Sequence, residues 1–446
     1  MSERAASARV EALLHRFGLD QVHVLACMSG DWGDLLDTCA ARIATLTIVA
    51  PHLNKGVPSR VGSFSLPTLV ISGDEGAPAN RARSLAAGFR RGELLQLRNY
   101  SSPMWADTVA DRTAEVKSAL LDFLERAERE HPLPAVELPQ RAGEFDGIRY
   151  RIRGRGTPVL LFPLSMAPSQ WEPLVSDLSA RYCTVSLSGA HLGPVALLES
   201  RARSGYGELV ARVLDDTKIS PDEVILEVGC GSGALSRALA TRTNESSRIV
   251  ATDINAFLLA EAEALANSEG TQDRINFERM DAEQLRYPDE RFDVSISCTV
   301  MEEGDANQML RELVRVTRPG GRVVVMTRAM DLDWYVNIPV SHDLRVKMNS
   351  VGPSTGAGVG AAGCADSSLY ARAIRAGLKP LSMGPQFAVY RQGERLQDVL
   401  TRLIAPLSGE EAKSCRDAIG LATNEGTLFV AEPFHCIIGK VSSRSH

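Results

Sequence analysis

Three glycines stand at every second position between an apolar run, Val224–Val228, and a helix-forming sequence that starts at Ala234. Gly229, Gly231 and Gly233 lack a Cβ, so they can adopt positive φ and let the backbone lie against a ligand, with helix-start N–H groups beyond them. The order predicts a strand, a tight turn and a helix, and such a turn can hold a nucleoside cofactor. A dinucleotide fingerprint and a glycine turn without a ligand fit the same spacing.

Two acidic residues follow at the ends of predicted strands. Asp253 ends a strand that begins at Arg248, about twenty residues after the turn, where a carboxylate can hydrogen-bond a ribose diol. Asp281 follows the next strand, which begins at Ile275. A fourth strand over residues 291–298 and the turn Arg318-Pro319-Gly320-Gly321, itself followed by an apolar strand, complete the series.

With Glu227 two residues before Gly229, this ordered series resembles the class I S-adenosylmethionine-dependent methyltransferases. Their motifs run Glu-x-Gly-x-Gly-x-Gly, a strand-end Asp, Asp-Ala and Arg-Pro-Gly-Gly. The resemblance covers residues 203–441 and implies an α/β fold with a Rossmann-like seven-stranded sheet that binds S-adenosyl-L-methionine. The cofactor-binding residues that it implies are Tyr206, Glu227, Gly229, Cys230, Gly231, Gly233, Asp253, Ile254, Asp281, Ala282 and Cys298.

The resemblance also assigns roles to these residues. It places Asp253 at the ribose, Asp281 and Ala282 at the adenine, and the glycine turn under the methionine end of the cofactor. Tyr206, in a helix that leads into the domain, has two interpretations, a lid over the cofactor or a residue of the core.

The chain before this segment alternates strands and helices, which predicts a parallel sheet covered by helices. Residues 15–125 supply four predicted strands and resemble the carboxy-terminal half of an α/β-hydrolase, whereas residues 147–187 supply three and resemble its amino-terminal half. We therefore expect one α/β-hydrolase-like domain over residues 1–195, with its halves in swapped order, followed by the methyltransferase domain over 196–446. Val159–Phe162 should then pair in parallel with Val22–Cys27; the rival interpretation is two separate fragments.

This first domain is expected to be catalytically silent. The family's nucleophile turn, Gly-x-Ser-x-Gly, reads Ala26-Cys27-Met28-Ser29-Gly30 here, so Ser29 is one residue out of register. The family's acid would fall near Gly76 and its histidine near Ser102, so no base stands beside the serine.

The acceptor class is narrowed by motifs that are missing. Ser297-Cys298-Thr299-Val300 stands where methyltransferases of DNA base amines carry Asn-Pro-Pro-Tyr or Asp-Pro-Pro-Tyr, and no Pro-Cys pair suggests cytosine chemistry. A small organic acceptor, such as a secondary metabolite, remains, with the insertion between Asp331 and Gly363 as the usual place for acceptor specificity. Two alternatives stay open: a protein that binds S-adenosylmethionine for non-methyl chemistry or a structural role, and a nicotinamide-dependent oxidoreductase.

Catalysis in this class is mainly placement, because the sulfonium already activates the methyl group. A base helps only where the acceptor loses a proton. Glu302 and Glu303 follow the fourth strand and His342 lies in the insertion. Glu303 and His342 are weak catalytic candidates, since a lone Glu or His is more often solvated or paired in the structure.

Composition sets outer limits. The 446 residues, 44% of them hydrophobic and 23% charged, suggest two or three domains with ordinary cores. A formal charge of -6 without basic runs argues against a nucleic-acid or anionic-membrane partner. The eight cysteines show no zinc-like spacing, so we expect free thiols, no metal and a cytoplasmic protein without a membrane span. Nothing in the sequence indicates an oligomeric state.

Overall fold

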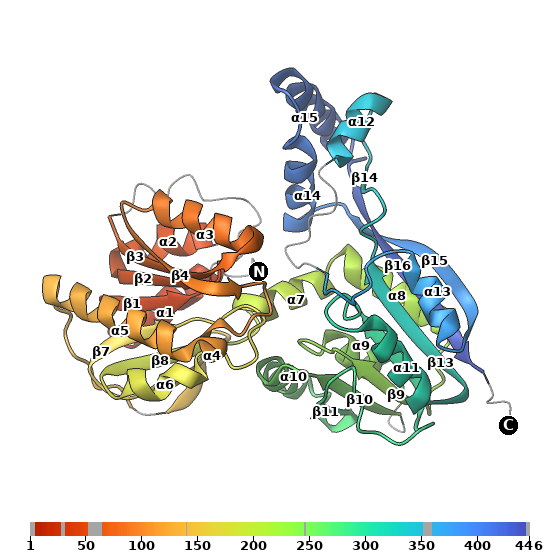
Figure 1. Ribbon diagram of the computed structural model, residues 1–446, viewed down its shortest axis with the longest axis horizontal. Helices are drawn as coiled ribbons and strands as arrows, with labels where there is room; N and C mark the ends of the chain where they lie inside the picture. Colours follow the sequence, from red (N-terminus) through yellow and green to blue (C-terminus); the bar gives the residue numbers. More distant parts are fainter. Residues whose placement is uncertain are drawn as a thin grey trace. The chain divides into compact units, whose positions relative to one another are not determined.

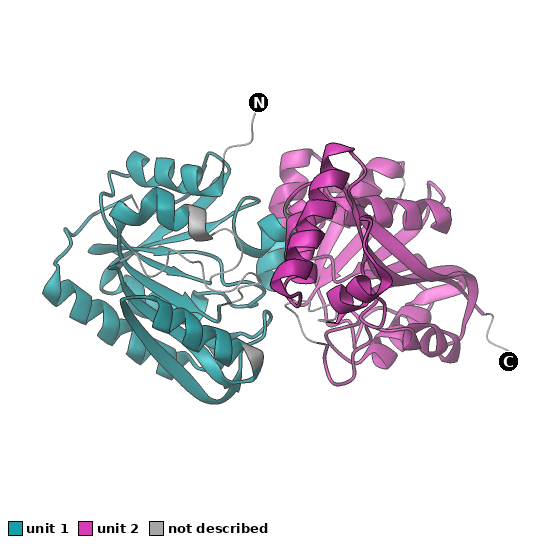
Figure 2. Ribbon diagram, turned by 90° about the horizontal axis from the view of Figure 1, so that it is seen from above, with its two compact units in different colours: residues 1–197, 255–261 teal, residues 198–254, 262–446 magenta. Residues whose placement is uncertain are grey.

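The computed structural model describes residues 5–27, 32–51, 65–139, 141–244, 247–350 and 359–442. The chain forms two compact units, which Figure 1 colours along the sequence and Figure 2 colours by unit. The first comprises residues 1–197 with 255–261, and the second comprises 198–254 with 262–446. Helix α7 (Gly193–Ala202) carries the chain from one unit into the other.

The first unit contains an eight-stranded sheet in the order β4-β3-β2-β1-β7-β8-β6-β5. Its strands are β1 (Val22–Ala26), β2 (Ile43–Val49), β3 (Pro67–Glu75), β4 (Arg91–Ser101), β5 (Ala142–Phe145), β6 (Ile148–Arg153), β7 (Thr157–Leu161) and β8 (Tyr182–Ser188). Seven of them were predicted, and the short edge strand β5 was not, because its four residues carry little apolar pattern.

The pairing of β1 with β7 confirms the prediction that the two segments share one sheet. The strands are parallel, with His23 opposite Val159 and Leu25 opposite Leu161. Both faces of the joint are buried: Val24 and Leu160 belong to one core cluster, and Leu25, Val159 and Leu161 to the other. An unbroken apolar run can be buried on both faces only in the middle of a covered sheet, so the interpretation as two separate fragments is wrong.

Helices cover both faces of this sheet (Figure 1). Helices α1 (Ala6–Arg16), α2 (Trp32–Cys39) and α3 (Gly76–Gly88) contribute residues to the core cluster with Val24. Helices α5 (Thr113–Glu130) and α6 (Glu172–Ser179) contribute to the cluster with Leu25, and the one-turn helix α4 (Thr108–Asp111) precedes α5.

A hydrolase would carry its nucleophile, acid and histidine at three positions of this unit. The first lies outside the described residues, and the other two hold residues that support the fold. Met28, Ser29 and Gly30 lie outside the residues that the structure describes. Ser102 is fully buried, and its hydroxyl bonds that of Ser72 at 2.9 Å. Gly76 opens helix α3 with a φ of +72°.

The second unit also contains an eight-stranded sheet, ordered β11-β10-β9-β12-β13-β16-β14, with β15 paired to β16. Its strands are β9 (Val224–Val228), β10 (Arg248–Asp253), β11 (Ile275–Arg279), β12 (Phe292–Cys298), β13 (Thr317–Arg328), β14 (Tyr335–Val336), β15 (Leu378–Tyr390) and β16 (Val430–Val441). Seven strands match the expected number, and β14 adds two residues beside the start of β16. Strands β9 to β13 run parallel, so their carboxyl ends meet at one edge.

Within the described residues after α7, the structure has eight helices (Figure 1). They are α8 (Gly205–Thr217), α9 (Ala234–Arg242), α10 (Ala256–Glu269), α11 (Ala306–Val316), α12 (His342–Asn349), α13 (Ser368–Arg375), α14 (Glu394–Ile404) and α15 (Gly409–Asn424). Helices α11 and α13 cover one face of the sheet, where Leu310, Leu313 and Leu369 pack against the strands. Helix α12 packs against α14, beyond the sheet.

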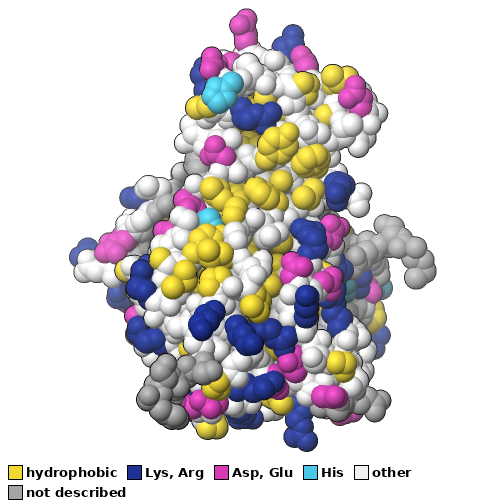
Figure 3. Space-filling view, turned by 90° about the vertical axis from the view of Figure 1, so that its right-hand side faces the viewer, with side chains coloured by type: hydrophobic (Ala, Val, Ile, Leu, Met, Phe, Trp, Pro, Cys, Tyr) yellow, Lys and Arg dark blue, Asp and Glu magenta, His cyan; other side chains and the backbone are white. Residues whose placement is uncertain are grey.

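Strand β15 is an element that the sequence pattern did not predict. Its thirteen residues include Pro380, Gly384 and Pro385, which normally argue against a strand. They are tolerated because β15 pairs only with β16, so it is an edge strand. Its exposed side chains include Leu381, Met383 and Phe387. Figure 3 shows hydrophobic side chains gathered in the middle of this side of the molecule, with Lys and Arg side chains below them.

The pairing of β1 with β7 can be tested by a substitution that removes part of the buried surface between the two halves of the sheet. Leu160 is 1% exposed; Leu160→Ala should lower the free energy of unfolding of the first unit by ~2–5 kcal/mol, because it removes transfer energy and leaves a cavity. Leu160→Met, which nearly conserves volume, should cost less than about 1.5 kcal/mol. Hydrogen exchange of β1 and β7 peptides in rising urea measures both values. Unchanged protection of β1 in Leu160→Ala, or cooperative unfolding of a fragment of residues 1–139, contradicts the shared sheet.

Candidate functional site

The glycine turn joins β9 to α9 and has the backbone conformation that its composition predicts. The φ angles of Gly229, Gly231 and Gly233 are +74°, +55° and +75°, a region that residues with a Cβ rarely adopt. A Cβ at Gly229 would lie 2.2 Å from Cγ2 of Val300. The N–H groups of Gly229 and Cys230 both donate to the carbonyl oxygen of Thr252, at 2.7 and 2.9 Å, which fixes the turn against the end of β10.

The two predicted acidic residues lie on the same edge as the turn. Oδ2 of Asp253, at the end of β10, accepts the N–H of Gly231 at 2.8 Å. Asp281 follows β11, and its Oδ1 accepts the N–H of Glu283 at 2.8 Å. Because the N–H of Met280 donates to the carbonyl oxygen of Asp253, at 3.0 Å, the residue before Asp281 is held beside β10.

The order of the strands gives the length of the row that these residues form along the sheet edge. β11, β10, β9 and β12 are consecutive neighbours, so Asp281, Asp253, the glycine turn and Cys298 follow one another along the edge. Strands lie about 4.8 Å apart, so this row spans roughly 14 Å. Cys298 and Ala282 are half-buried, whereas Ile254 is 55% exposed beside Asp253. The ends of four neighbouring strands therefore bring Asp281, Asp253, the glycine turn and Cys298 to one edge of the sheet.

Glu227 lies beneath the turn and is nearly fully buried. The hydroxyl of Ser236 donates to its Oε2. Burial raises the pKa of Glu227 to about 8, the hydrogen bond from Ser236 opposes the shift, and the charge of Asp253 adds to it. The raised pKa favours the protonated, neutral form of Glu227 under the turn.

A buried polar network below the turn was not foreseen from the sequence. The hydroxyl of Ser232 donates to Oε1 of Glu199 at 2.6 Å, and Nη2 of Arg237 donates to Oε2 of Glu199 at 2.7 Å. Nη1 of Arg237 also donates to the carbonyl oxygen of Ser232 at 2.6 Å. All three side chains are buried, and such a pair is stable only when its remaining polar atoms are bonded. No sequence signal links Glu199 in α7 with a turn more than thirty residues away.

The loop after β12 brings two adjacent glutamates to the same edge. Glu302 is fully buried, and its Oε1 accepts the backbone N–H of Arg328 at 2.9 Å and the guanidinium Nε of Arg328 at 3.3 Å. Part of the Glu303 residue is exposed to solvent. The surrounding protein partly desolvates its carboxyl group, which raises the pKa of Glu303 to about 7. The neighbouring charge of Glu302 adds to that shift, and Arg328 opposes it.

The end of the Gly/Ala-rich insertion lies directly on this loop. The N–H of Gly360 donates to the carbonyl oxygen of Glu302 at 2.7 Å, and that of Cys364 to the carbonyl oxygen of Met301 at 2.8 Å. A Cβ at Gly363 would lie 2.4 Å from the carbonyl oxygen of Glu302, so only glycine permits this approach. Residues 351–358 of the insertion lie outside the described residues.

Tyr206 is buried in α8 and contacts two side chains at this edge. Its ring lies 5.4 Å from that of Phe434, which supports the interpretation as a core residue. The Cζ atom of the Arg201 guanidinium lies 3.6 Å from the centroid of the Tyr206 ring. Burial raises the pKa of Tyr206. Sequence reasoning missed Arg201, because nothing in the pattern distinguishes it from Arg203.

His342 is not part of this constellation. It is the first residue of α12 and is exposed. Figure 1 shows α12 beside α14 and α15, away from β9 and β10. The structure therefore brings Glu303 to the carboxyl edge but does not bring His342 there.

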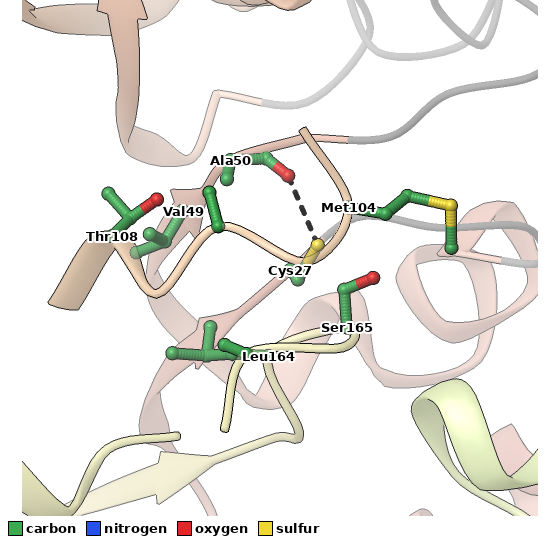
Figure 4. Close-up of a pocket in the computed structure, with 9 residues that line it drawn as sticks. Cys27, Val49, Ala50, Met104, Thr108, Leu164 and Ser165 are labelled. Carbon is green, nitrogen blue, oxygen red and sulfur yellow. Dashed lines mark hydrogen bonds between the residues drawn. The ribbon is translucent and has the colours of Figure 1, made fainter. Parts of the chain in front are cut away.

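A small pocket in the first unit lies where β1, β2 and β7 end (Figure 4). Its lining residues are Cys27, Val49, Ala50, Met104, Ala106, Thr108, Leu164, Ser165 and Ala167, and they include no histidine and no carboxylate. The thiol of Cys27 donates to the carbonyl oxygen of Ala50 at 3.2 Å. This lining offers no general base for nucleophilic catalysis.

Neither a group of metal ligands nor a membrane-spanning helix occurs among the described residues. No three His, Cys, Asp or Glu side chains among them are grouped as metal ligands. In the same parts of the chain, every helix is too short or too polar to cross a membrane.

Known methyltransferases are similar in sequence to part of this chain. A ubiquinone/menaquinone biosynthesis C-methyltransferase, UbiE of Hahella chejuensis, is 34% identical over 114 residues, which cover 25% of this chain and 46% of that protein. Methyltransferase GfsG of Streptomyces halstedii is 33% identical over 108 residues, 24% of this chain and 38% of that protein. The chain thus spans less than half the length of either curated relative. A crystal structure of geranyl diphosphate C-methyltransferase from Streptomyces coelicolor A3(2) covers 53% of this chain and 76% of its own, with 16% identity and a TM-score of 0.33.

Residues 225–321 match the family described as methyltransferase domain. This segment begins inside β9 and ends inside β13, so it contains the glycine turn, both strand-end acids and the two glutamates. Residues 225–321 of the chain therefore match a methyltransferase domain.

Proposed function

We propose that the protein transfers a methyl group from S-adenosylmethionine to a small organic acceptor. The observation that carries this proposal is the row of Asp281, Asp253, the glycine turn and Cys298 along one sheet edge. UbiE is named as a C-methyltransferase, so carbon is the first acceptor atom to test.

The residues present fit the cofactor. A carboxylate at the end of β10 suits a ribose diol, because a charged acceptor forms short hydrogen bonds with hydroxyl groups. We assign this role to Asp253, the adenine to Asp281 and Ala282 with the exposed Ile254 beside it, and the methionine end to the turn at Gly229–Gly233, where no side chain separates the backbone from a ligand. The cofactor supplies a methyl group that its sulfonium already activates.

The protein's contribution is therefore placement and, for some acceptors, removal of a proton. We assign the base to Glu303, because it lies at the carboxyl edge and has a pKa of about 7. Where the acceptor must lose a proton as it is methylated, a carboxylate oxygen of Glu303 would accept that proton. Glu302, held by Arg328 and by the backbone of Gly360, fixes the loop that carries Glu303.

We propose that residues 1–195 are a scaffold with an α/β-hydrolase-like sheet and no catalysis of their own. The pocket at its strand ends lacks a base, and Ser102 and Gly76 hold structural positions. A fluorophosphonate probe that labels Ser29 would contradict this assignment. Transfer of a labelled methyl group to product separates methyl transfer from the two alternatives, cofactor binding without methyl transfer and nicotinamide-dependent oxidation.

Asp253 provides the direct test of cofactor binding. Asp253→Ala should weaken the binding of S-adenosylhomocysteine by ~1–3 kcal/mol, because a charge-assisted hydrogen bond to the ribose is lost. Isothermal titration calorimetry measures the change. Asp273→Ala, which removes an exposed acid before β11, should leave the affinity unchanged. Equal affinities in wild type and Asp253→Ala would remove Asp253 from the site.

Glu303 gives the reaction a pH dependence of known sign. A base must be ionised, so the single-turnover rate of methyl transfer should rise with pH through about 7 and level off above it. Glu303→Gln should lower the rate by ~10²–10⁴-fold and abolish the rise. Rapid-quench measurement with labelled methyl donor reads both effects. Glu263→Gln, an exposed position on α10, is the matched control; a pH profile that survives in Glu303→Gln shows that another group is the base.

A further inference from the structure

Arg201, in the last turn of α7, presents a guanidinium at the carboxyl edge of the sheet. Its Nη1 donates to Oγ1 of Thr299 at 3.2 Å, and its Cζ lies 3.6 Å from the centroid of the Tyr206 ring. Thr299 directly follows β12 and has a φ of +59°. A hydrogen bond on one side and an aromatic face on the other fix the plane and direction of the guanidinium.

The charge of Arg201 is not balanced within the described residues. Other buried or half-buried arginines near this edge pair with carboxylates: Arg237 with Glu199, Arg328 with Glu302, and Arg395 with Glu432. Arg201 forms no ion pair with any carboxylate in the part of the chain that the structure describes. A guanidinium carries five N–H donors, and one bond to Thr299 leaves most of them for a ligand.

The contacts of Arg201 place it on one side of the proposed site. It touches Thr299 after β12, Tyr206 in α8, and, at 6.0 Å, the ring of Phe434 in β16. Asp253 and Asp281 lie on the other side of the glycine turn, at the ends of β10 and β11. Arg201 therefore lies on the Cys298 side of the glycine turn, and Thr299, which it bonds, begins the loop that carries Glu303, the base proposed for the acceptor.

We infer that Arg201 binds an oxyanion of the acceptor, a carboxylate or a phosphate, and that the acceptors of this enzyme are anionic. The inference rests on the proposed function, because it uses the position of the proposed base. A fixed, half-buried guanidinium forms two parallel hydrogen bonds with such a group, which neutralises its charge and orients the acceptor. The methionyl carboxylate of the cofactor has the same chemistry, so the test must separate the two sources.

The test compares a charged probe with its neutral analogue. Full-length protein saturated with S-adenosylhomocysteine is titrated with benzoate, phenyl phosphate and benzamide, and binding is followed by ligand-observed NMR. Wild type should bind at least one of the two anions about tenfold or more tightly than benzamide, because a charged hydrogen-bonded pair is gained. Arg201→Met should bring that ratio close to one, and Arg201→Lys should retain part of it. Arg203→Met, an exposed arginine of the same segment, should keep the wild-type ratio.

Equal binding of both anions and benzamide by wild type, or an unchanged ratio in Arg201→Met, overturns the inference. Calorimetry with S-adenosylhomocysteine and 5′-methylthioadenosine, which lacks the carboxylate, gives the second arm. If Arg201→Met weakens only the former, the guanidinium serves the cofactor and the acceptor assignment is wrong. If wild type binds neither nucleoside, the proposed function itself fails, and this result is distinct from a lost preference for anions.

Discussion

The glycine turn of the second unit is held in place by one backbone carbonyl group, that of Thr252. The oxygen of Thr252 accepts the N–H groups of both Gly229 and Cys230, so the chain must leave β9 sharply against the end of β10. Residues with a Cβ rarely adopt the backbone angles that follow, and a Cβ at Gly229 would collide with Val300 in the loop after β12. The turn therefore sets the spacing of three strand ends at once. Asp253, one residue after Thr252, then reaches the N–H of Gly231 without any further adjustment.

Support for this turn comes from polar groups that are removed from water. Burial raises the pKa of Glu227 more than the hydrogen bond from Ser236 lowers it, which favours a neutral group under the turn. Glu199 and Arg237 are ionic, but each oxygen of Glu199 has a donor and Arg237 also bonds the backbone of Ser232. Removing one partner of such a pair costs more than the pair itself contributes, because the other charge is left buried. The conformation of the turn is thus set from below as well as from β10.

Sequence reasoning predicted what depends on local pattern. Apolar runs between glycines gave β9, β10, β12 and β1 to within a few residues, and the motif order gave the positions of Asp253 and Asp281. It failed where the environment overrides propensity: β15 contains Pro380 and Pro385, which an edge strand accepts. It also missed the contacts of Glu199 and Arg201, since both join residues far apart in the chain. His342 was a candidate because of its residue type alone, and the fold places it on α12.

The order of strands in the first unit has a consequence for synthesis. Val159 lies 136 residues after its neighbour His23, yet β1 is in the middle of the sheet. A ribosome adds about 5–20 residues per second, so roughly 7–27 s pass between the appearance of β1 and that of the strand that covers its open side. During this interval the nascent chain presents a strand that is fully buried in the native sheet and has unpaired backbone groups on one side, the kind of edge that recruits other chains. We therefore expect β1 to be open to pairing with other chains until residues 157–161 have been synthesised.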